Sequence, residues 1–566
     1  MKRPRPGAWW QWWLPESLSG RVLLAAFLAA GSVLRLADVG PALLFGDELH
    51  SLGDMLGGYP RIFSHFSETG GGLALPLFQR LLLDFFGDSH WIIRAPAWLP
   101  GLALLVLTFP IARRQWGETT ALAATALVAV SPLLIFYAHF GRIYSLVALL
   151  CLLLYDRLAE WSRRANERPR AGAGLIVLTT LLPWAHPTAL GFLLPAYAGA
   201  LLACGLMPNR SAGSLRRAAL HLAGALALGG LLCLLAYWPA RESLAAFLAE
   251  KTRAEYYGAF GPLDVASLVM GSRSAFIGLA LLVAAGTWAA LREAPGRGVL
   301  LLFAAIGPGL AIACIQPYGD AYAYARYVMP SVAPLCVLAG RGLSLVGETI
   351  PFPERGAVPW ASAALALVLW LTGPLGPGQP RAAEHANTYL SLLALPAFDA
   401  PWPETPSFYR DLAARPAGER ADLRLLEVPA LTTRTRHLYR HYQVQHGVPS
   451  LLAPLPGEFP RIPHGPYTAF QRPGWQEDSD ADFLVVHLDV AEEIAGYWRW
   501  LYGPQGPGPF PAREEAFMER HRRYGGLLPR PSAALLEVLR DQLGEPLRAE
   551  DGLVVWKLRK SPAESD

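Results

Sequence analysis

Charged residues are scarce in this sequence: 17% of its 566 residues are charged, whereas an ordinary soluble domain has about 25%. The deficit is uneven. Long apolar runs fill the chain up to about residue 375, and the remainder has the composition of a soluble protein. This split excludes one large globular core. It predicts a transmembrane domain over 1–375 and a soluble domain over 376–566, joined by a Gly/Pro-rich linker at 373–383.

Cysteine is also scarce, and no clear metal-ligand motif is present. The five cysteines all lie in or beside apolar segments, which argues against a disulfide framework or a zinc site. The run Asp478, Asp480 and Asp482 has Phe483 where a calcium loop of the EF-hand type needs glycine, so we interpret it as a solvated loop. We predict no cofactor and no metal site, although a divalent cation is compatible with the acidic pair described below. The basic residues cluster between apolar segments, so a nucleic-acid surface is not expected.

Apolar segments of about 20 residues, the length that crosses a membrane, recur along the first domain. Their number, about eleven, is typical of an α-helical polytopic membrane protein. We place them at 21–38, 95–113, 118–137, 143–160, 172–187, 189–206, 220–238, 271–291, 298–315, 328–347 and 357–375.

Basic residues between these segments predict the orientation, since cytoplasmic loops are enriched in Lys and Arg. The basic clusters fall on one side if the N-terminus is cytoplasmic and residues 39–94 form the first external loop. We interpret residues 73–87 of that loop as an amphipathic helix that lies in the membrane interface. The alternative is that 73–87 spans the membrane, which would place Arg113 and Arg114 on the external side. Cleavage of the first apolar run as a signal peptide is the less favoured alternative. We predict a multi-pass protein of a bacterial inner membrane, with its C-terminal domain periplasmic or extracellular.

An acidic pair, Asp47 and Glu48, follows the first apolar segment within the predicted external loop. Two adjacent carboxylates at a membrane surface are costly unless they are solvated, paired or used. A carboxylate there could take the proton of an acceptor hydroxyl as a general base. A solvated loop is the alternative.

Two arginines lie at predicted external ends of apolar segments, where the positive-inside bias disfavours them. Arg142 lies between His139 and Tyr144, and Arg326 lies beside Tyr327 in a tyrosine-rich stretch. A guanidinium matches the geometry of a phosphate, so both arginines predict a phosphate contact. The alternatives are snorkelling to lipid headgroups and a tyrosine belt at the interface.

His186, at the end of the fifth apolar segment, lies on the same predicted face. It is either a further ligand contact or an ordinary residue at a helix end. Acids, arginines, tyrosines and this histidine thus gather on one membrane face, which suits chemistry on a lipid-borne phosphate.

At these residues the sequence resembles bacterial members of the dolichyl-phosphate-mannose–protein mannosyltransferase superfamily, which have the GT-C fold (family 39-like). The resemblance covers residues 20 to about 347 and rests on several unconnected motifs in the family's order. These motifs are Phe45-Gly46-Asp47-Glu48, Phe85-Phe86-Gly87-Asp88 with Arg94-Ala95-Pro96, Arg113-Arg114-Gln115-Trp116-Gly117, Ser131-Pro132-Leu133-Leu134 with Arg142-Ile143-Tyr144-Ser145-Leu146, and Arg326-Tyr327-Val328-Met329-Pro330.

The resemblance implies that Asp47 is the catalytic acid, with Glu48 beside it, and that Arg142 and Tyr144 form the family's arginine and tyrosine motif. The chain departs from the family at 70–73, where it has Gly-Gly-Gly-Leu and many members carry His-Pro-Pro or Lys-Pro-Pro. We expect the missing phosphate or acceptor contact to come from earlier polar residues of the loop, namely Arg61, His65 and Glu68.

These observations predict an inverting glycosyltransferase that moves a hexosyl or pentosyl group from a polyprenyl-phosphate donor to an extracytoplasmic glycan, lipid or protein. Asp47 would act as the base, and Arg142, Arg326 and nearby tyrosines would stabilise the leaving phosphate. The alternative is a transporter or lipid-linked-sugar flippase, which predicts charges near the bilayer midplane, broken helices and an internal repeat. None of these is evident in the sequence. A scaffold with a partner-binding tail is a third interpretation, but it needs far fewer spans.

The second domain has the pattern of a small α/β or α+β fold. Apolar periodicity and length predict helices at 405–415 and 532–543 and strands at 423–428, 483–488 and 553–558.

Overall fold

The computed structural model describes residues 13–37, 48, 51, 54–55, 58–66, 72–86, 90–164, 172–206, 212–251, 269, 273–315, 321–349, 357–372, 402–429, 433–448, 450–452, 481–490, 492–493, 496, 531 and 533–558. The chain divides into two compact units. The first contains Met1–Val39, Tyr59–Arg381 and Asn387–Ala394, and the second contains Gly40–Gly58, Ala382–Ala386 and Leu395–Asp566. Part of the predicted external loop therefore groups with the second unit.

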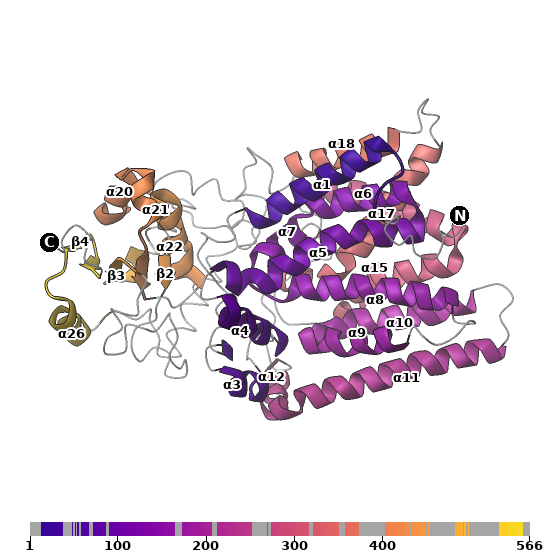
Figure 1. The fold of residues 1–566 in the computed structure, drawn as a ribbon, viewed down its shortest axis with the longest axis horizontal. Helices are drawn as coiled ribbons and strands as arrows, with labels where there is room; N and C mark the ends of the chain where they lie inside the picture. Colours follow the sequence, from indigo (N-terminus) through magenta and orange to yellow (C-terminus); the bar gives the residue numbers. More distant parts are fainter. Residues whose placement is uncertain are drawn as a thin grey trace. The chain divides into compact units, whose positions relative to one another are not determined.

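The first unit is a bundle of long helices that pack side by side (Figure 1). Each apolar segment predicted from the sequence contains a helix. These helices are α1 (Leu18–Leu36), α5 (His90–Trp116), α6 (Glu118–Val130), α7 (Pro132–His139), α8 (Tyr144–Arg164), α9 (Gly172–Ala185), α10 (Leu190–Gly205), α11 (Ala212–Tyr237), α14 (Arg273–Glu293), α15 (Pro295–Ile315), α17 (Val332–Thr349) and α18 (Ala357–Thr372).

Within the described residues, five helices are long and apolar enough to cross a membrane, or up to six if a bent pair counts as one span. Three further apolar helices in the described part of the chain are shorter: Gly172–Ala185, Pro295–Ala311 and Val358–Leu371. The first unit is thus helical and has several candidate spans. The number of about eleven spans stays a prediction.

The predicted span 118–137 is not one straight helix. α6 ends at Val130, α7 begins at Pro132, and the two are bent by 54°. Proline lacks an N–H and disfavours helical geometry in the residue before it, and Ser131 is accordingly extended, with ψ 115°. The prediction of an unbroken helix is wrong here.

The two ends of the first unit carry different chemistry. At one end, ion pairs join the start of α1 and the ends of several other helices. Along α8, Asp156 of these pairs lies twelve residues from Tyr144, which is about 18 Å at 1.5 Å per residue, so Tyr144 lies at the opposite end. The pairs are Arg113 with Glu16 (3.1 Å) and Glu118 (3.2 Å), Arg114 with Asp156, and Arg341 with Glu293 (3.1 Å).

Shorter helices lie between the long ones: α3 (Gly58–Ser64), α4 (Ala74–Phe86), η3 (Pro187–Ala189), η4 (Trp238–Ala240), α12 (Arg241–Lys251), α16 (Ala321–Val328) and η5 (Met329–Ser331). α4 confirms the helix predicted at 73–87. Its polar residues Arg80 and Asp84 pair at 2.7 Å, and Phe85 and Phe86 at its end are exposed. Its position at the membrane interface stays a prediction.

The second unit contains a five-stranded sheet with the strand order β2-β1-β3-β5-β4. β1 (Leu425–Val428) is parallel to β2 (Ser450–Leu452) and β3 (Phe483–His487). β5 (Leu553–Lys557) is antiparallel to β3 and to β4 (Arg548–Glu550). The elements predicted from the sequence correspond to α20 (Ser407–Ala414), β1, β3, α26 (Ala533–Leu543) and β5. The observed α21 (Ala417–Ala421), α22 (Thr433–His446), β2 and β4 have no predicted counterpart.

Helices cover both faces of this sheet. Alternate strand residues such as Leu425, Val485 and Val555 pack against α20 and α22, and the intervening residues of the strands pack against α26. The second unit is therefore an α/β sandwich of three layers.

Candidate functional site

Arg142 lies in the turn at 140–143, which joins α7 to α8. The backbone N–H of Arg142 donates to the Phe140 carbonyl at 2.5 Å, and Ser145 Oγ donates to the Tyr137 carbonyl at 2.9 Å. The first bond closes the turn, and the second ties α8 to α7 across it. Arg142 is only 1% exposed, which is not the arrangement of a side chain that snorkels to headgroups.

Two arginines from distant parts of the sequence approach the same tyrosine ring. The guanidinium carbons of Arg142 and Arg326 each lie 6.0 Å from the centroid of the Tyr144 ring. Arg326, in α16, also lies 4.9 Å from the ring centroid of Tyr327 and donates to its hydroxyl at 3.1 Å. A cation is attracted to an aromatic face within about 6 Å, so the two tyrosines hold both cations.

His186 joins these residues from the connection between α9 and η3. Its ring centroid lies 5.1 Å from that of Tyr144 and 6.1 Å from that of Tyr327. We call Arg142, Tyr144, His186, Arg326 and Tyr327 the arginine–tyrosine cluster. All five are predicted site residues, and the structure brings them together.

The His186 ring is neutral and offers one hydrogen-bond donor. Its Nδ1 accepts a hydrogen bond from the backbone N–H of Thr188 at 3.3 Å, so the proton is on Nε2. That Nε2–H has no hydrogen-bond partner among the residues that the structure describes. The cluster therefore combines two guanidinium groups with a neutral donor, a set that suits a phosphate.

An apolar pocket lies at the bend between α6 and α7. Its lining includes Leu127, Pro132, Leu279, Cys336 and Leu369. Pro132 begins the helix that leads to the turn at 140–143, and α17 begins directly after α16 and η5, which carry part of the cluster. The pocket is thus in the half of the first unit that contains the arginine–tyrosine cluster.

His139, a predicted phosphate contact, is held by a different partner. Its Nε2 lies 2.7 Å from the carbonyl oxygen of Leu34, near the end of α1. That bond ties the last residue of α7 to α1. A contact of His139 with a donor phosphate stays a prediction.

The predicted residues of the first external loop are only partly described. Asp47 and Glu68 lie outside the described residues. Glu48 is buried, and the hydroxyl of Ser51 donates to its backbone carbonyl at 3.4 Å. Arg61 and His65 lie in and just after α3 and are half-buried, with the His65 N–H bonded to the Arg61 carbonyl at 2.9 Å. Their roles stay predictions.

Gly72, in the stretch where the sequence departs from the family, packs against the residue before His186. A Cβ at Gly72 would lie 2.7 Å from the carbonyl oxygen of Ala185, and its φ is +67°. Only glycine adopts this conformation and approach without strain. The departure at 70–73 therefore coincides with a close contact beside the cluster.

Sequence reasoning does not single out Arg35, which is fully buried in α1. An arginine inside a predicted span is a signal in itself, because its burial in an apolar segment requires partners. Those partners are the carbonyls of Gly31, Val128 and Ala129, at 2.7 to 3.0 Å.

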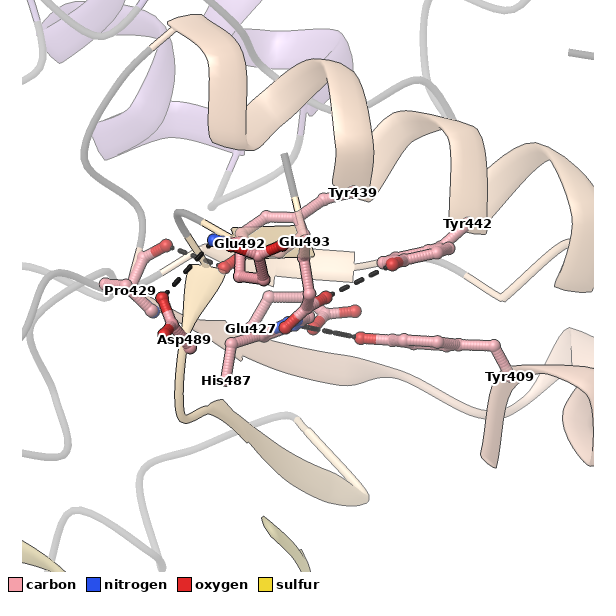
Figure 2. A network of polar contacts seen from close by, with 9 residues as sticks. All are labelled: Tyr409, Glu427, Pro429, Tyr439, Tyr442, His487, Asp489, Glu492 and Glu493. Atoms are coloured by element: carbon pink, nitrogen blue, oxygen red, sulfur yellow. Dashed lines mark hydrogen bonds and ion pairs between the residues drawn. The ribbon is translucent and has the colours of Figure 1, made fainter. Parts of the chain in front are cut away.

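The second unit contains a polar network at the carboxyl ends of β1 and β3. Figure 2 shows His487 between the carboxylates of Glu427 and Glu493. His487 donates from Nε2 to Glu427 and from Nδ1 to Glu493, both at 3.0 Å. The hydroxyls of Tyr409 and Tyr442 donate to Glu427 at 2.7 Å and to Glu493 at 3.1 Å. The network joins both strands to α20 and α22.

This network is charged and buried. Burial alone would lower the pKa of His487, but Glu493 and Glu427 outweigh it and raise the pKa to about 9. Both ring nitrogens therefore carry protons at neutral pH. His487 and Glu427 are fully buried, which identifies them as an ordered polar core and not as a surface that a ligand reaches.

No protein-family model matches the sequence, and no curated protein matches it. In structure, the chain is similar to ArnT from Cupriavidus metallidurans bound to undecaprenyl phosphate, with 13% identity and a TM-score of 0.49 over 96% of this chain and 99% of that one. It is also similar to the archaeal oligosaccharyltransferase AglB from Archaeoglobus fulgidus in complex with an inhibitory peptide and a dolichol-phosphate, with 12% identity and a TM-score of 0.46 over 86% of this chain and 74% of that one. At such values the likeness concerns the general course of the chain. The function has to be argued from the side chains.

Proposed function

We propose that this chain is a membrane glycosyltransferase that transfers a sugar from a polyprenyl-phosphate donor to an extracytoplasmic acceptor, with inversion at the anomeric carbon. The observation that carries the proposal is the meeting of Arg142 and Arg326 on the ring of Tyr144 at one end of an apolar bundle. Two guanidinium groups at one ring form a cationic site, and their planar geometry matches the oxygens of a phosphate.

The cluster would act on the leaving group. As the bond between the anomeric carbon and the phosphate oxygen breaks, that oxygen takes the electron pair and the phosphate gains a negative charge. Arg142 and Arg326 would stabilise this charge, and the Nε2–H of His186 would donate to it. Groups that stabilise charge as it develops supply much of the rate enhancement in such reactions.

We assign the base to Asp47, on the strength of the family motif that falls on it. Its carboxylate would take the proton of the acceptor hydroxyl as the new C–O bond forms on the opposite face of the sugar. Glu48 would stand beside it. No metal ion is required in this scheme, because the arginines neutralise the phosphate.

The apolar pocket at the bend is suited to the first isoprene units of the donor lipid. It is lined by aliphatic side chains such as Leu127, Leu279 and Leu369 and lies in the same half of the unit as the cluster. The membrane already holds the polyprenyl chain out of water, so the pocket would contribute by packing against the first isoprene units and positioning them beside the cluster.

Replacing Asp47 with Asn tests the assignment of the base. Asn has the shape of Asp but cannot accept the proton, so Asp47→Asn should lower sugar transfer about 100- to 10,000-fold. Transfer is measured in membranes with a radiolabelled polyprenyl-phosphate sugar. Insertion and binding of undecaprenyl phosphate should not change.

Asp84→Asn is the matched control, since it removes an exposed carboxylate from α4, in the same predicted loop. It should keep transfer close to the wild-type rate. Full activity in Asp47→Asn would rule out the base assignment.

A transporter or flippase is the second candidate, and the bend between α6 and α7 favours it, because broken helices are typical of such proteins. The same substrate distinguishes the two in sealed vesicles. Movement of the lipid-linked sugar across the membrane without a transfer product would support transport.

A further inference from the structure

α6 ends without the hydrogen bonds that a continuing helix would supply. Its last carbonyls, including those of Val128 and Ala129, would normally accept from residues four positions later. Pro132 has no N–H to donate to the Val128 carbonyl. The backbone N–H of Ser131 donates to that carbonyl instead, over a long distance of 3.4 Å.

Arg35 of α1 supplies hydrogen-bond donors to these carbonyls. Its Nη2 donates to the Val128 carbonyl at 2.7 Å, and its Nη1 donates to the Ala129 carbonyl at 3.0 Å. One turn earlier in α1, Gly31 allows this close approach, because a Cβ there would lie 3.0 Å from that of Ala129 and 2.7 Å from Leu105. The fully buried guanidinium thus takes over the hydrogen bonds that the bend removes.

The last residue of α7 is bonded to the same end of α1. This residue, His139, bonds to the carbonyl of Leu34, the neighbour of Arg35, at 2.7 Å. Two adjacent residues of α1 therefore hold the end of α6 before the bend and the last residue of α7, the helix that leads directly into the turn carrying Arg142.

We propose that Arg35 is a positioning residue: it fixes the bend between α6 and α7 and so places Arg142 against Tyr144. This inference rests on the proposed function, since the benefit of that placement is phosphate binding by the arginine–tyrosine cluster. Arg35 acts through the backbone of α6 and α7. A helix made continuous through residue 132 would carry α7 in another direction and move Arg142 away from the cluster.

Two variants separate positioning from simple stabilisation. Arg35→Met introduces an unbranched apolar side chain of similar length but removes the guanidinium donors to the carbonyls of Val128 and Ala129. The double variant Arg35→Met/Pro132→Ala supplies a new N–H at 132, which allows α6 to continue and satisfies its carbonyls internally. Each is purified in lipid nanodiscs for three measurements: thermal unfolding, amide hydrogen exchange of residues 132–143, and binding of undecaprenyl phosphate.

We expect Arg35→Met to lower the thermal stability, to raise exchange in 132–143, and to weaken undecaprenyl phosphate binding about tenfold or more, the effect of a lost charged contact. The double variant should regain stability but not binding, because its bend is lost. Arg113→Met is the matched control: Arg113 joins α5 to Glu16 and Glu118 at the opposite end, so stability should fall while exchange in 132–143 and binding stay unchanged.

Recovery of both stability and binding in the double variant would overturn the proposal, and Arg35 would then be a stabilising residue only. Unchanged exchange in 132–143 for Arg35→Met would overturn it as well. If the wild-type protein does not bind undecaprenyl phosphate, the proposed function fails, and the exchange measurements still decide whether Arg35 holds the turn.

Discussion

Arg142 and Arg326 lie equally far from the ring of Tyr144, yet their surroundings differ. Arg142 is fully buried in a turn that is bonded to α7 and α8, whereas Arg326 is partly exposed and bonded to the hydroxyl of Tyr327. A buried charge contributes more to binding than an exposed one because water screens it less. The two arginines should therefore contribute unequally to phosphate binding.

Substitution of each arginine tests this difference. Arg142→Gln should weaken undecaprenyl phosphate binding by about 1.5–3 kcal/mol, or roughly 10- to 150-fold, as expected for a hydrogen bond to a charged group. Arg326→Gln should weaken it less. The measurement is equilibrium binding to the purified protein. Arg241→Gln, which removes an exposed arginine stacked 5.0 Å from Trp238, should leave binding unchanged, and an equal loss in that control would contradict a specific site.

The sequence identifies the residues of the arginine–tyrosine cluster one by one, because arginines at predicted external helix ends are unusual in themselves. It does not show that they meet, since 144, 186 and 326 lie in three separate helical regions. Arg35 and His487 also have partners that the sequence does not show. Arg35 bonds to carbonyls of α6, and His487 bonds to Glu427 of β1, 60 residues away.

Helices are the level at which the sequence is most informative, because apolar length alone locates them. The exception is the bend at Pro132. α5 contains Pro96, Pro100 and Pro110 and remains one helix, so a proline does not by itself predict a break. At this bend, Arg35 of α1 donates hydrogen bonds to the carbonyls of α6 that the bend leaves without backbone donors. The residues around 132 do not predict this tertiary contact.

The contact between Gly72 and the end of α9 yields a prediction for a pair of glycines. Gly72→Ala should lower the free energy of unfolding by about 1–3 kcal/mol, because a Cβ would meet the Ala185 carbonyl and the positive φ is unfavourable. Thermal unfolding in nanodiscs measures the change. Gly174→Ala, in α9 with open space around it, is the control and should be neutral or stabilising by up to about 1 kcal/mol. Equal effects of the two substitutions would contradict the close contact.

Across the whole molecule, the two units depend on charge in different ways. The first unit has ion pairs at one end and arginines against tyrosines at the other. The compartment that each end faces stays a prediction. The second unit holds a charged side chain, His487, inside its core.

The raised pKa of His487 predicts how the second unit responds to pH. Because the pKa in the folded chain is about 9, above the usual 6.5, the protonated ring adds stability that is full below pH 6.5 and is lost as the pH rises through 9. Opening of β1 and β3 should become easier by up to about 1.4 kcal/mol per pH unit in that range. Hydrogen exchange of peptides 425–428 and 483–487 in the full chain, corrected for intrinsic rates, measures this.

His487→Gln is the comparison for that measurement. Gln keeps one donor but does not titrate, so its strands should be less protected at neutral pH and should show little further change up to pH 9. A wild-type protein whose protection is constant from pH 6.5 to 9 would contradict a protonated His487.

α7 lies between two points that are bonded to α1, namely the carbonyls at the end of α6 and its own last residue, His139. Its eight residues set the rotation as well as the distance between those points. Each residue of an α-helix turns the chain by about 100° and advances it by about 1.5 Å. Inserting or deleting one residue between 132 and 139 would therefore swing the following turn by more than a quarter of a revolution. The seven buried residues of α7 can be exchanged for apolar residues of similar size, whereas its length is expected to be invariant.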